Sequence, residues 1–367
     1  MKILVTGAKG FIGKNVCLRL RELDHDILPF VNGDTYEDLT NLINEADAII
    51  HLAGVNRSSI EKDFLDTNID LTKNICKSMK FLKKSIPILF SSSTQFDNNN
   101  IYGKSKLMAE KCLLQFSKNY DCDISIFRLP GVFGKFCKPN YNSVVATFCY
   151  NIAHELPIFI SNEENNLRLI YIDDLINKFI EILNNKRKVG VKFIDVSPVY
   201  NIKLGELAKK IQSFAHLEKQ ILVDQVGSGL TRALYSTYLS YLPKEKFIQD
   251  VNVNVDNRGV FAEIFKTKEN GQISYFSSKP GVTRGGHYHH SKVERFLVVR
   301  GKAKFKFQNI ITKEKFEIYT CCSKPQFVYT VPGWSHDITN VDDKEMIVVL
   351  WANENFNREQ PDTWKEL

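Results

Sequence analysis

The chain has 367 residues, enough for two or three domains, and its 43% hydrophobic and 25% charged content is typical of globular proteins. The net charge of +7 comes from scattered lysines without a long basic block, so nucleic-acid binding is not indicated. No apolar run reaches membrane-spanning length, and the N-terminus lacks the apolar core of a signal peptide. The eight cysteines include no CxxC pair, which favours reduced thiols and a cytoplasmic protein.

The first predicted strand, residues 3–6, leads into a glycine-rich turn and then a helical pattern. Gly7, Gly10 and Gly13 occupy this turn. A dinucleotide-binding turn needs one glycine for the tight bend, one for close approach to a pyrophosphate and one for helix–strand packing. The N-terminus of the following helix stabilises the phosphate charge. The order strand, glycine turn, helix therefore predicts a dinucleotide site.

The second predicted strand, residues 26–31, bears on the choice of cofactor. It ends at Asn32, where an acidic residue would hold the ribose hydroxyls of NAD. Lys9, in the glycine turn, can face a 2′-phosphate. We therefore expect NADPH, although Asp34 is close enough that a shifted alignment reverses this preference.

Two further buried strands precede a helix that carries candidate catalytic residues. The strand at residues 47–54 ends in small side chains, and the strand at 87–94 ends in hydroxyls, at the edge where open parallel sheets bind ligands. Tyr102 and Lys106 share one face of the next predicted helix. A lysine ammonium in this position lowers the pKa of the phenol and favours proton transfer at neutral pH.

These patterns resemble the extended short-chain dehydrogenase/reductase family, with motifs at residues 6–13, 51–54, 68, 91–93 and 102–106. The resemblance implies that Tyr102 donates or accepts the proton and that Lys106 holds the nicotinamide ribose. It also implies that Ser93 binds the substrate carbonyl, with Thr94 as the alternative hydroxyl. The cofactor-binding residues implied by the resemblance are Gly7, Lys9, Gly10, Phe11, Ile12, Gly13, Asn32, Leu52, Ala53, Gly54, Asn68, Tyr102 and Lys106.

Three segments concern the substrate. Residues 96–98 stand where this family usually has Val-Tyr-Gly, and the interval before the tyrosine is short. Gly131 replaces an asparagine that commonly helps to bind substrate, so contacts are not transferred there. Arg168 resembles an arginine that lies near the nucleotide diphosphate in this family, and bidentate pairing suits that role. The alternative is an ion pair of Arg168 with Asp173 or Asp174.

Beyond residue 251 the patterns change from helix length to strand length, with turns of Gly, Pro or Asn between most of them. This is the signature of a β-sandwich or barrel. We place the boundary near residue 250, after a tyrosine-rich segment that ends at Pro243. The expected fold is a Rossmann-type, doubly wound parallel α/β domain at residues 1–250, followed by an all-β domain at residues 251–367.

Three histidines and a glutamate of the second domain can converge on one site. His287 and His289 are two residues apart and face the same side of an extended strand. Glu294 opens the next predicted strand and can join them across a hairpin, and His336 completes the set from a distant strand. Imidazole and carboxylate bind borderline divalent metals, and we expect zinc. A histidine-rich surface hairpin without a site is the alternative.

The spacing from Gly281 to Gly301 resembles the first cupin motif, which implies that the all-β domain is a cupin barrel. The second motif departs from the family because Pro332 directly precedes its glycine. The Arg-Gly-Gly-His-Tyr segment that begins at Arg284 also resembles cupin sugar-nucleotide epimerases, in which histidine removes a proton beside a ketone. We therefore expect Arg284 to bind substrate, and the roles of base and metal ligand compete for His287. A purely structural barrel used for dimerisation is the alternative.

A carbonyl reductase joined to an epimerase-like cupin predicts a ketosugar substrate. The ketone acidifies the neighbouring C–H, so a base can invert that carbon through an enolate before hydride reduces the ketone, and a divalent metal can stabilise the enolate. Over nearly the whole chain the motifs resemble bifunctional enzymes of capsular-polysaccharide synthesis. The resemblance implies epimerisation at C-3 of UDP-2-acetamido-2,6-dideoxy-4-hexulose. It also implies NADPH-dependent reduction at C-4 to UDP-2-acetamido-2,6-dideoxy-L-talose, on the route to N-acetyl-L-fucosamine.

We expect a homodimer that acts on a UDP-sugar and has no nucleic-acid or membrane partner. Two other classes remain open. One is a sugar-nucleotide epimerase or dehydratase that retains tightly bound NAD. The other is a non-catalytic, metal-binding cupin that serves as a dimer module.

Overall fold

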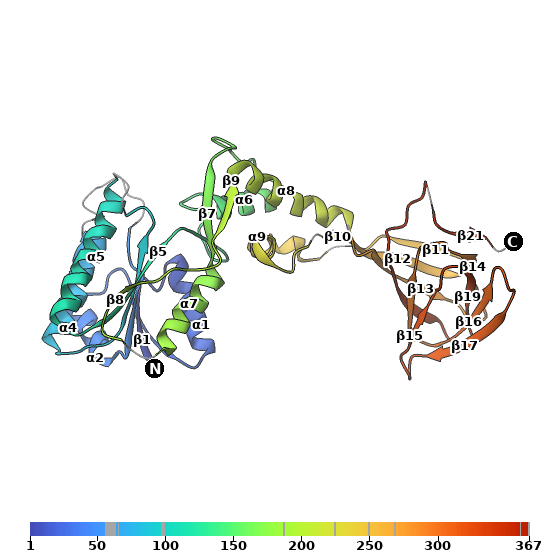
Figure 1. Ribbon diagram of the computed structural model, residues 1–367, viewed down its shortest axis with the longest axis horizontal. Coiled ribbons are helices and arrows are strands. Elements are labelled where there is room, and N and C mark those ends of the chain that lie inside the picture. Colours follow the sequence, from blue (N-terminus) through green and yellow to red (C-terminus); the bar gives the residue numbers. More distant parts are fainter. Residues whose placement is uncertain are drawn as a thin grey trace. The chain divides into compact units, whose positions relative to one another are not determined.

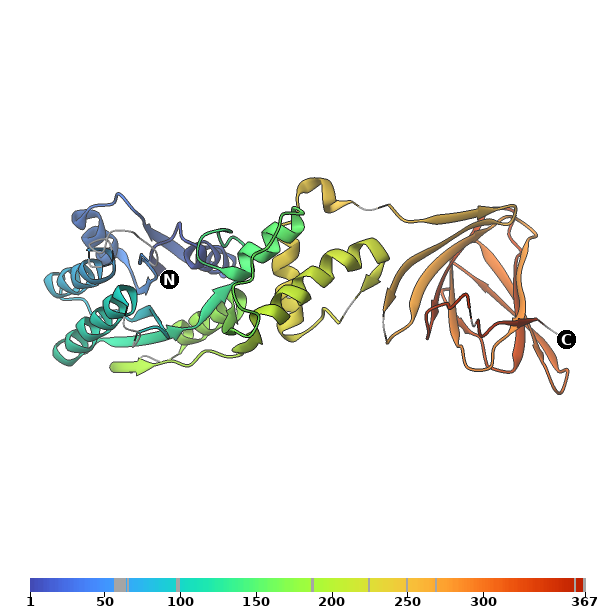
Figure 2. The same ribbon diagram turned by 90° about the horizontal axis from the view of Figure 1, so that it is seen from above.

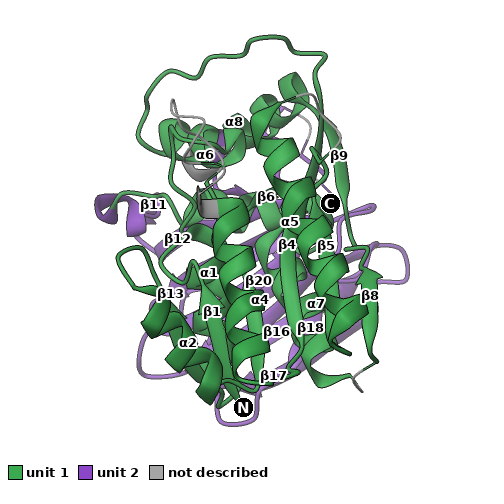
Figure 3. Ribbon diagram, turned by 90° about the vertical axis from the view of Figure 1, so that its left-hand side faces the viewer, with its two compact units in different colours: residues 1–213, 227–243 green, residues 214–226, 244–367 purple. Residues whose placement is uncertain are grey.

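The computed structural model describes residues 1–55, 64, 66–96, 100–185, 188–223, 225–248, 250–267, 269–359 and 361–365. It contains two compact units, one of residues 1–213 and 227–243 and the other of residues 214–226 and 244–367 (Figure 3). The expected boundary near residue 250 makes each domain one continuous segment. The units are not continuous, because β10 (Leu222–Val223) pairs with a strand of the second unit before the chain returns to the first.

The first unit is built on a six-stranded sheet with strand order β2-β1-β3-β4-β5-β8, in which every neighbouring pair is parallel. The winding reverses between β1 and β3, which is the position where open α/β sheets bind ligands. Figure 1 shows α2, α4 and α5 on one face of this sheet and α1 and α7 on the other. The elements are β1 (Lys2–Thr6), α1 (Phe11–Glu22), β2 (Asp26–Phe30), α2 (Tyr36–Glu45), β3 (Ala48–His51), α4 (Leu71–Phe81), β4 (Ile88–Ser93), α5 (Ile101–Asn119), β5 (Asp123–Leu129), α7 (Ile172–Asn184) and β8 (Gly190–Phe193).

Burial of the sheet on both faces explains its apolar strands. Ile3, Leu4 and Val5 are all 0% exposed, because helices cover both sides of β1. The helices begin at local signals, as in α2, where Thr35 and Asp38 form a reciprocal capping box. Polar side chains lie at the C-terminal ends of several strands, as Thr6, His51 and Ser93 do, and so at one edge of an otherwise apolar sheet.

A smaller three-stranded sheet and the remaining helices complete the first unit. The strand order is β6-β7-β9, with β6 parallel and β9 antiparallel to β7. Helix α8 begins in this unit, and its last residues belong to the second unit. These elements are β6 (Gly131–Phe133), α6 (Val144–Ala153), β7 (Asn166–Tyr171), β9 (Tyr200–Lys203), α8 (Leu204–Gln220) and α9 (Gly229–Leu239).

The second unit consists of two sheets, which Figure 2 shows on opposite sides of the unit. One has the order β10-β12-β13-β20-β15-β18, with β11 paired to β12, and the other has the order β17-β16-β19-β14-β21. All pairs are antiparallel apart from the short pair of β10 and β12. The strands are β11 (Val253–Asp256), β12 (Gly259–Thr267), β13 (Gln272–Ser278), β14 (Thr283–Tyr288), β15 (Glu294–Arg300), β16 (Lys302–Asn309), β17 (Lys315–Cys321), β18 (Phe327–Tyr329), β19 (Trp334–Asn340), β20 (Met346–Ala352) and β21 (Trp364–Lys365).

Apolar side chains between the two sheets form the core of this unit. Phe276, Phe296 and Phe305 belong to it, and they come from strands of both sheets. The expected fold class is confirmed: a doubly wound parallel α/β domain is followed by a multi-stranded antiparallel β domain. Among the described residues, no helix combines the length and apolarity that a membrane span requires.

Candidate active site and candidate metal centre

The glycine turn between β1 and α1 brings the backbone of two loops into close contact. A Cβ on Gly7, whose φ is +71°, would lie 2.9 Å from the backbone of Ala53, and a Cβ on Gly13 would lie 2.2 Å from the Gly7 carbonyl oxygen. Helix α1 has no side-chain cap and no acidic residue in its first turn, which includes Phe11 and Ile12. Its N-terminal amides and the positive end of its dipole are therefore suited to an anionic ligand.

A series of buried, hydrogen-bonded polar side chains lies next to this turn. The Thr6 hydroxyl accepts hydrogen bonds from the amides of Leu52 and Ala53 and lies 2.8 Å from His51 Nδ1. His51 Nε2 lies 2.9 Å from the Thr72 hydroxyl. Burial, reinforced by the charge of a nearby lysine, lowers the pKa of His51 to about 3. His51 is therefore a neutral, structural residue that holds the loop after β3.

Ser93, Tyr102 and Lys106 converge where β4 ends and α5 begins. The Asn100 side chain caps α5 by accepting a hydrogen bond of 2.7 Å from the Gly103 amide, which fixes the first turn of the helix. The Ser93 side chain lies near the Tyr102 hydroxyl and acts to lower its pKa. Burial nevertheless raises the pKa of Tyr102, the opposite of the direction expected from a nearby ammonium.

Lys106 is only 4% exposed and points at the same edge of the sheet. Its Nζ donates a hydrogen bond of 2.9 Å to the Ser91 carbonyl, and a Cβ on Gly54 would lie 3.1 Å from that nitrogen. Burial lowers the pKa of Lys106 to about 8, although Glu110 acts in the opposite direction. Lys106 therefore ionises closer to neutral pH than an exposed lysine does, one helical turn beyond Tyr102 on α5.

Asn68 connects the loop after β3 with α5. Its side-chain amide donates to the Ser105 hydroxyl at 2.8 Å and to the Val55 carbonyl at 3.0 Å, and its oxygen accepts from the Val55 amide at 2.8 Å. Asn68 therefore sets the spacing between Gly54 and the helix that carries the catalytic candidates. Asp97 and Asn98, which depart from the family pattern, lie outside the described residues.

A charge pair with a buried carboxylate, which the sequence did not predict, lies behind this site. Glu110 is 1% exposed, and its carboxylate accepts hydrogen bonds from Arg128 at 2.8 and 3.1 Å and from Ser92 at 2.5 Å. The Arg128 guanidinium also lies 3.6 Å from the centroid of the Phe96 ring. The spacing of Tyr102, Lys106 and Glu110, four residues at each step, was the available signal.

The residues that bear on the cofactor's ribose lie at the surface. Lys9 and Asn32 are exposed. The Asp34 carboxylate accepts a hydrogen bond of 2.7 Å from the Val31 amide, so it already caps the turn after β2. Asp34, the residue that could change the expected preference from NADPH to NADH, is therefore already hydrogen-bonded to the backbone of Val31.

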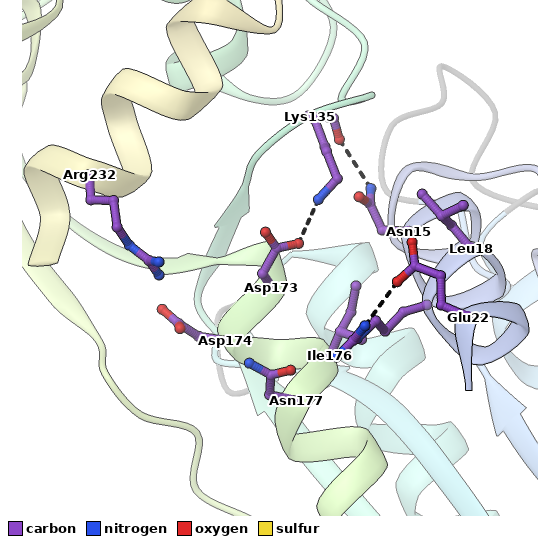
Figure 4. A pocket seen from close by; sticks show the side chains of 10 residues that line it. Asn15, Leu18, Glu22, Lys135, Asp173, Asp174, Ile176, Asn177 and Arg232 are labelled. Atoms are coloured by element: carbon purple, nitrogen blue, oxygen red, sulfur yellow. Dashed lines mark hydrogen bonds and ion pairs between the residues drawn. The ribbon is translucent and has the colours of Figure 1, made fainter. Parts of the chain in front are cut away.

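A polar cavity of about 330 Å³ lies elsewhere in the first unit and contains none of the predicted site residues (Figure 4). On its wall Asp173 pairs with Lys135 at 2.6 Å, and Asp174 faces Arg232. Arg168 is exposed on β7 and, within the described part of the chain, forms an ion pair with neither acid. The ion-pair alternative for Arg168 is therefore wrong.

His287, His289, Glu294 and His336 meet inside the second unit. One potential ligand atom of each lies within 4.8 Å of the others. His287 lies opposite His336 across the pair β14–β19, after a bulge at Gly285. A Cβ on Gly285, whose φ is +103°, would lie 2.7 Å from the His336 carbonyl oxygen, so the bulge depends on glycine.

The electrostatics of this cluster fit a divalent cation. Burial acts to raise the pKa of Glu294, but the adjacent His289 and His336 rings and the charge of Lys292 outweigh it and hold that pKa below its usual range. Burial also lowers the pKa of His287 to about 4, with help from the two other histidines. Three imidazoles around one carboxylate are a suitable donor set for zinc.

Arg284 lies on β14 but is not one of the four clustered side chains. Its guanidinium donates a hydrogen bond of 3.0 Å to the Ser277 carbonyl and lies 3.9 Å from the Asp256 carboxylate. Its guanidinium carbon is 5.2 Å from the centroid of the Phe276 ring. Arg284 is therefore held against the neighbouring sheet.

The parallel sheet, its glycine turn and the convergent serine, tyrosine and lysine define a nucleotide-dependent oxidoreductase or epimerase fold. Residues 3–202 match the NAD dependent epimerase/dehydratase family, and the chain belongs to that family. Members of this family use a nicotinamide cofactor. Residues 254–364 match the polysaccharide biosynthesis C-terminal domain.

Full-length relatives narrow this assignment. The chain is 48% identical over 365 residues to UDP-2-acetamido-2,6-beta-L-arabino-hexul-4-ose reductase of Pseudomonas aeruginosa, covering 99% of this chain and 98% of that protein. It is also similar to the crystal structure of the capsular polysaccharide assembling protein CapF from Staphylococcus aureus, with a TM-score of 0.92, 38% identity and complete coverage of both chains. A UDP-glucuronic acid 4-epimerase from Bacillus cereus, with 18% identity and a TM-score of 0.56, shares the fold over 66% of this chain and 98% of its own.

Proposed function

We propose that this chain is a bifunctional UDP-sugar enzyme of surface-polysaccharide synthesis that epimerises and then reduces a 4-ketosugar. The observation that carries the proposal is the approach of the Ser93 side chain to the Tyr102 hydroxyl at the end of β4, with the buried Lys106 one helical turn further along α5. Full-length similarity to a hexulose reductase supports the same reaction class. In this proposal residues 1–250 form the reductase domain and residues 251–367 form a cupin epimerase domain.

The reductase step uses three side chains. The Ser93 hydroxyl bonds the C-4 carbonyl oxygen, and Tyr102 donates its phenolic proton to that oxygen. NADPH, when bound, supplies the hydride. Lys106 holds the nicotinamide ribose, and its ammonium stabilises the phenolate that remains on Tyr102.

The glycine turn and the loop after β3 form the proposed cofactor site. Gly7, Gly10 and Gly13 permit the pyrophosphate to approach the N-terminus of α1. Exposed Lys9 and Asn32 favour the 2′-phosphate of NADPH, and the Asp34 carboxylate is occupied by the Val31 amide. Arg168 is the proposed contact to the substrate diphosphate, supported by its exposure.

The proposed epimerase step takes place at the cluster of the second unit. The proposed metal site consists of His287, His289, Glu294 and His336, which contribute nitrogen and carboxylate donors. Zinc, when bound there, supplies Lewis-acid stabilisation of negative charge on the ketone oxygen. The alternative role of His287, whose low pKa keeps it neutral, is to accept the proton from C-3, in which case the other three residues hold the metal. Arg284 is the proposed substrate contact.

The order of the two steps follows from the chemistry. The proton at C-3 is acidic only while the C-4 ketone is present, so epimerisation precedes reduction. The proposed product is UDP-2-acetamido-2,6-dideoxy-L-talose, on the route to N-acetyl-L-fucosamine. We also propose that the protein is a homodimer, which light scattering tests. We propose a cytoplasmic location, because its eight free thiols are stable in that reducing compartment.

The test follows NADPH oxidation and sugar C–H exchange with a UDP-linked 4-keto-6-deoxy-N-acetylhexosamine in deuterated water. Intact protein is compared with Tyr102→Phe and His287→Ala. We expect Tyr102→Phe to stop oxidation and retain deuterium uptake at C-3, and His287→Ala to lose that uptake. An intact protein that neither oxidises NADPH nor exchanges deuterium contradicts the proposal. Turnover without net NADPH consumption favours an NAD-retaining epimerase.

A further inference from the structure

The C-terminal segment of the chain lies directly against the proposed metal centre. Strand β21 pairs with β14, which places Lys365 opposite His287 and Trp364 opposite Tyr288. Residues 361–365 therefore flank the strand that carries one candidate ligand and the loop that carries another, although they are distant in sequence. Nothing in the proposed reaction accounts for this arrangement.

The Asp362 carboxylate binds three consecutive amides of the loop between β14 and β15. One oxygen accepts from the His290 amide at 2.9 Å, and the other accepts from the amides of Ser291 at 2.7 Å and Lys292 at 2.8 Å. The Ser291 hydroxyl adds a bond of 2.9 Å. Successive backbone N–H groups that converge on one anion form a rigid nest, so Asp362 fixes the conformation of this loop.

The same segment orients the His289 ring. His289 Nδ1 lies 2.5 Å from the backbone carbonyl oxygen of Asp362. A carbonyl oxygen can only accept, so Nδ1 carries the hydrogen. Nε2 therefore faces Glu294, whose carboxylate oxygen is 3.2 Å away. This is the arrangement in which a partner on one ring nitrogen prepares the other nitrogen to bind a metal.

The second oxygen of Glu294 is held in a related way. Lys292 is 7% exposed, and its Nζ lies 3.4 Å from Glu294 Oε1 and 3.4 Å from the Thr363 hydroxyl. Glu294 Oε2 is the oxygen that faces the histidines, at 3.2 Å from His289 Nε2 and 3.6 Å from His336 Nε2. Lys292 thus occupies one carboxylate oxygen and leaves the other for the centre of the cluster.

We propose that residues 361–365 form a clamp that positions two ligands of the metal centre, with Asp362 as its positioning residue. The clamp holds the Nδ1–H form of His289 and fixes the loop that leads to Glu294. This inference rests on the proposed metal centre. It adds to that proposal a C-terminal segment that contributes no ligand of its own.

Zinc affinity of the full-length protein tests the clamp. The dissociation constant is measured by competition with a chromophoric chelator for wild type, Asp362→Asn and Asp342→Asn. Asp342 is a half-buried turn carboxylate of the same unit that accepts from the Asp343 amide, outside the ligand loop. We expect Asp362→Asn to weaken zinc binding roughly 10–100-fold, the usual effect of losing a partner that orients a ligand. Asp342→Asn should bind like wild type.

The outcomes separate the clamp from the metal centre. Wild-type affinity in Asp362→Asn overturns the clamp and leaves the metal centre intact. An absence of zinc binding in wild type overturns the metal centre and the clamp together. Thermal unfolding of the metal-free variants checks that Asp362→Asn remains folded.

A spectroscopic measurement separates positioning from general stability. In metal-free protein labelled with ¹⁵N-histidine, the His289 resonances, identified by their loss in His289→Gln, should report hydrogen on Nδ1. Asp362→Asn should shift them toward a mixture of tautomers, while Asp342→Asn leaves them unchanged. A wild-type His289 whose Nδ1 carries no hydrogen overturns the clamp.

Discussion

Glu110 lies one helical turn beyond Lys106 on the buried face of α5, and its charge raises the pKa of that lysine against the effect of burial. Glu110 is itself held by two hydrogen bonds from Arg128, at 2.8 and 3.1 Å. The ionisation of the proposed catalytic lysine therefore depends on an arginine that comes from β5.

Replacing Glu110 with glutamine should shift the pH dependence of the reductase. Without the carboxylate the pKa of Lys106 falls further, so activity should be lost on the alkaline side at a lower pH than in wild type. Stability should fall by about 1–3 kcal/mol, because Arg128 loses a charged acceptor. The measurements are NADPH oxidation against pH and urea unfolding. Glu45→Gln, which removes an exposed partner of Lys2, is the control. An unchanged pH profile in Glu110→Gln contradicts the prediction.

Replacing Lys106 with methionine should abolish reduction and yet stabilise the fold at neutral pH. Burial lowers the pKa of Lys106 from 10.5 to about 8, so the unfolded chain binds more protons between these values and wild-type stability rises with pH there. At pH 7 the buried ammonium costs about 3 kcal/mol relative to the unfolded chain. Lys106→Met should recover part of this free energy, and its stability should no longer increase between about pH 8 and pH 10.5. Lys104→Met, at an exposed position of α5, should retain this increase in stability with pH.

Removal of metal should separate the two proposed activities. Dialysis against a chelator should abolish deuterium uptake at C-3, because Glu294 and the three histidines are the proposed site of Lewis-acid stabilisation. Reduction of a 4-ketosugar that already has the product configuration at C-3 should continue. Added zinc should restore exchange in wild type but not in His336→Gln. Exchange that persists after complete removal of metal argues that the metal has no catalytic part.

Replacing Gly13 with alanine should damage the first unit. The new Cβ would lie 2.2 Å from the Gly7 carbonyl oxygen and 2.8 Å from Ala8 Cα, both backbone atoms that cannot yield without moving the turn. Overpacking of this kind costs about 1–3 kcal/mol and sometimes more, so the melting temperature and NADPH binding should both fall. Gly227→Ala, where a Cβ meets nothing within 4 Å, should leave both near wild type. Normal NADPH binding by Gly13→Ala would show that the turn tolerates a side chain.

Replacing Asn32 with aspartate should move cofactor preference from NADPH toward NADH. Asn32 is exposed just after β2, where a carboxylate would repel a 2′-phosphate and accept hydrogen bonds from ribose hydroxyls. At a distance of about 4 Å near a protein surface such repulsion corresponds to a few kcal/mol, so the ratio of kcat/KM for NADPH over NADH should fall at least tenfold. Asn41→Asp, exposed on α2, should not change this ratio. An unaltered ratio in Asn32→Asp places the 2′-phosphate elsewhere.

The sequence by itself determined the features that depend on local spacing. The period of a strand predicts that His287 and His289 face one side, and the rings lie 5.1 Å apart. The period of a helix predicts that Tyr102 and Lys106 share a face, and the structure has Lys106 buried and Tyr102 half-buried in the first turns of α5. These relations hold because backbone geometry alone fixes which neighbours along a chain point the same way.

Only the tertiary structure decided which distant groups meet and how strongly burial acts on them. Arg128 reaches Glu110 because β5 pairs with β4, and Asp362 reaches the loop after His289 because β21 pairs with β14. No period along the chain encodes either contact. The pKa of Tyr102 rises where the sequence suggested a fall, because desolvation depends on everything packed around the phenol. Long-range pairing and burial are properties of the packed chain, so they became visible only once its strands and helices were in place.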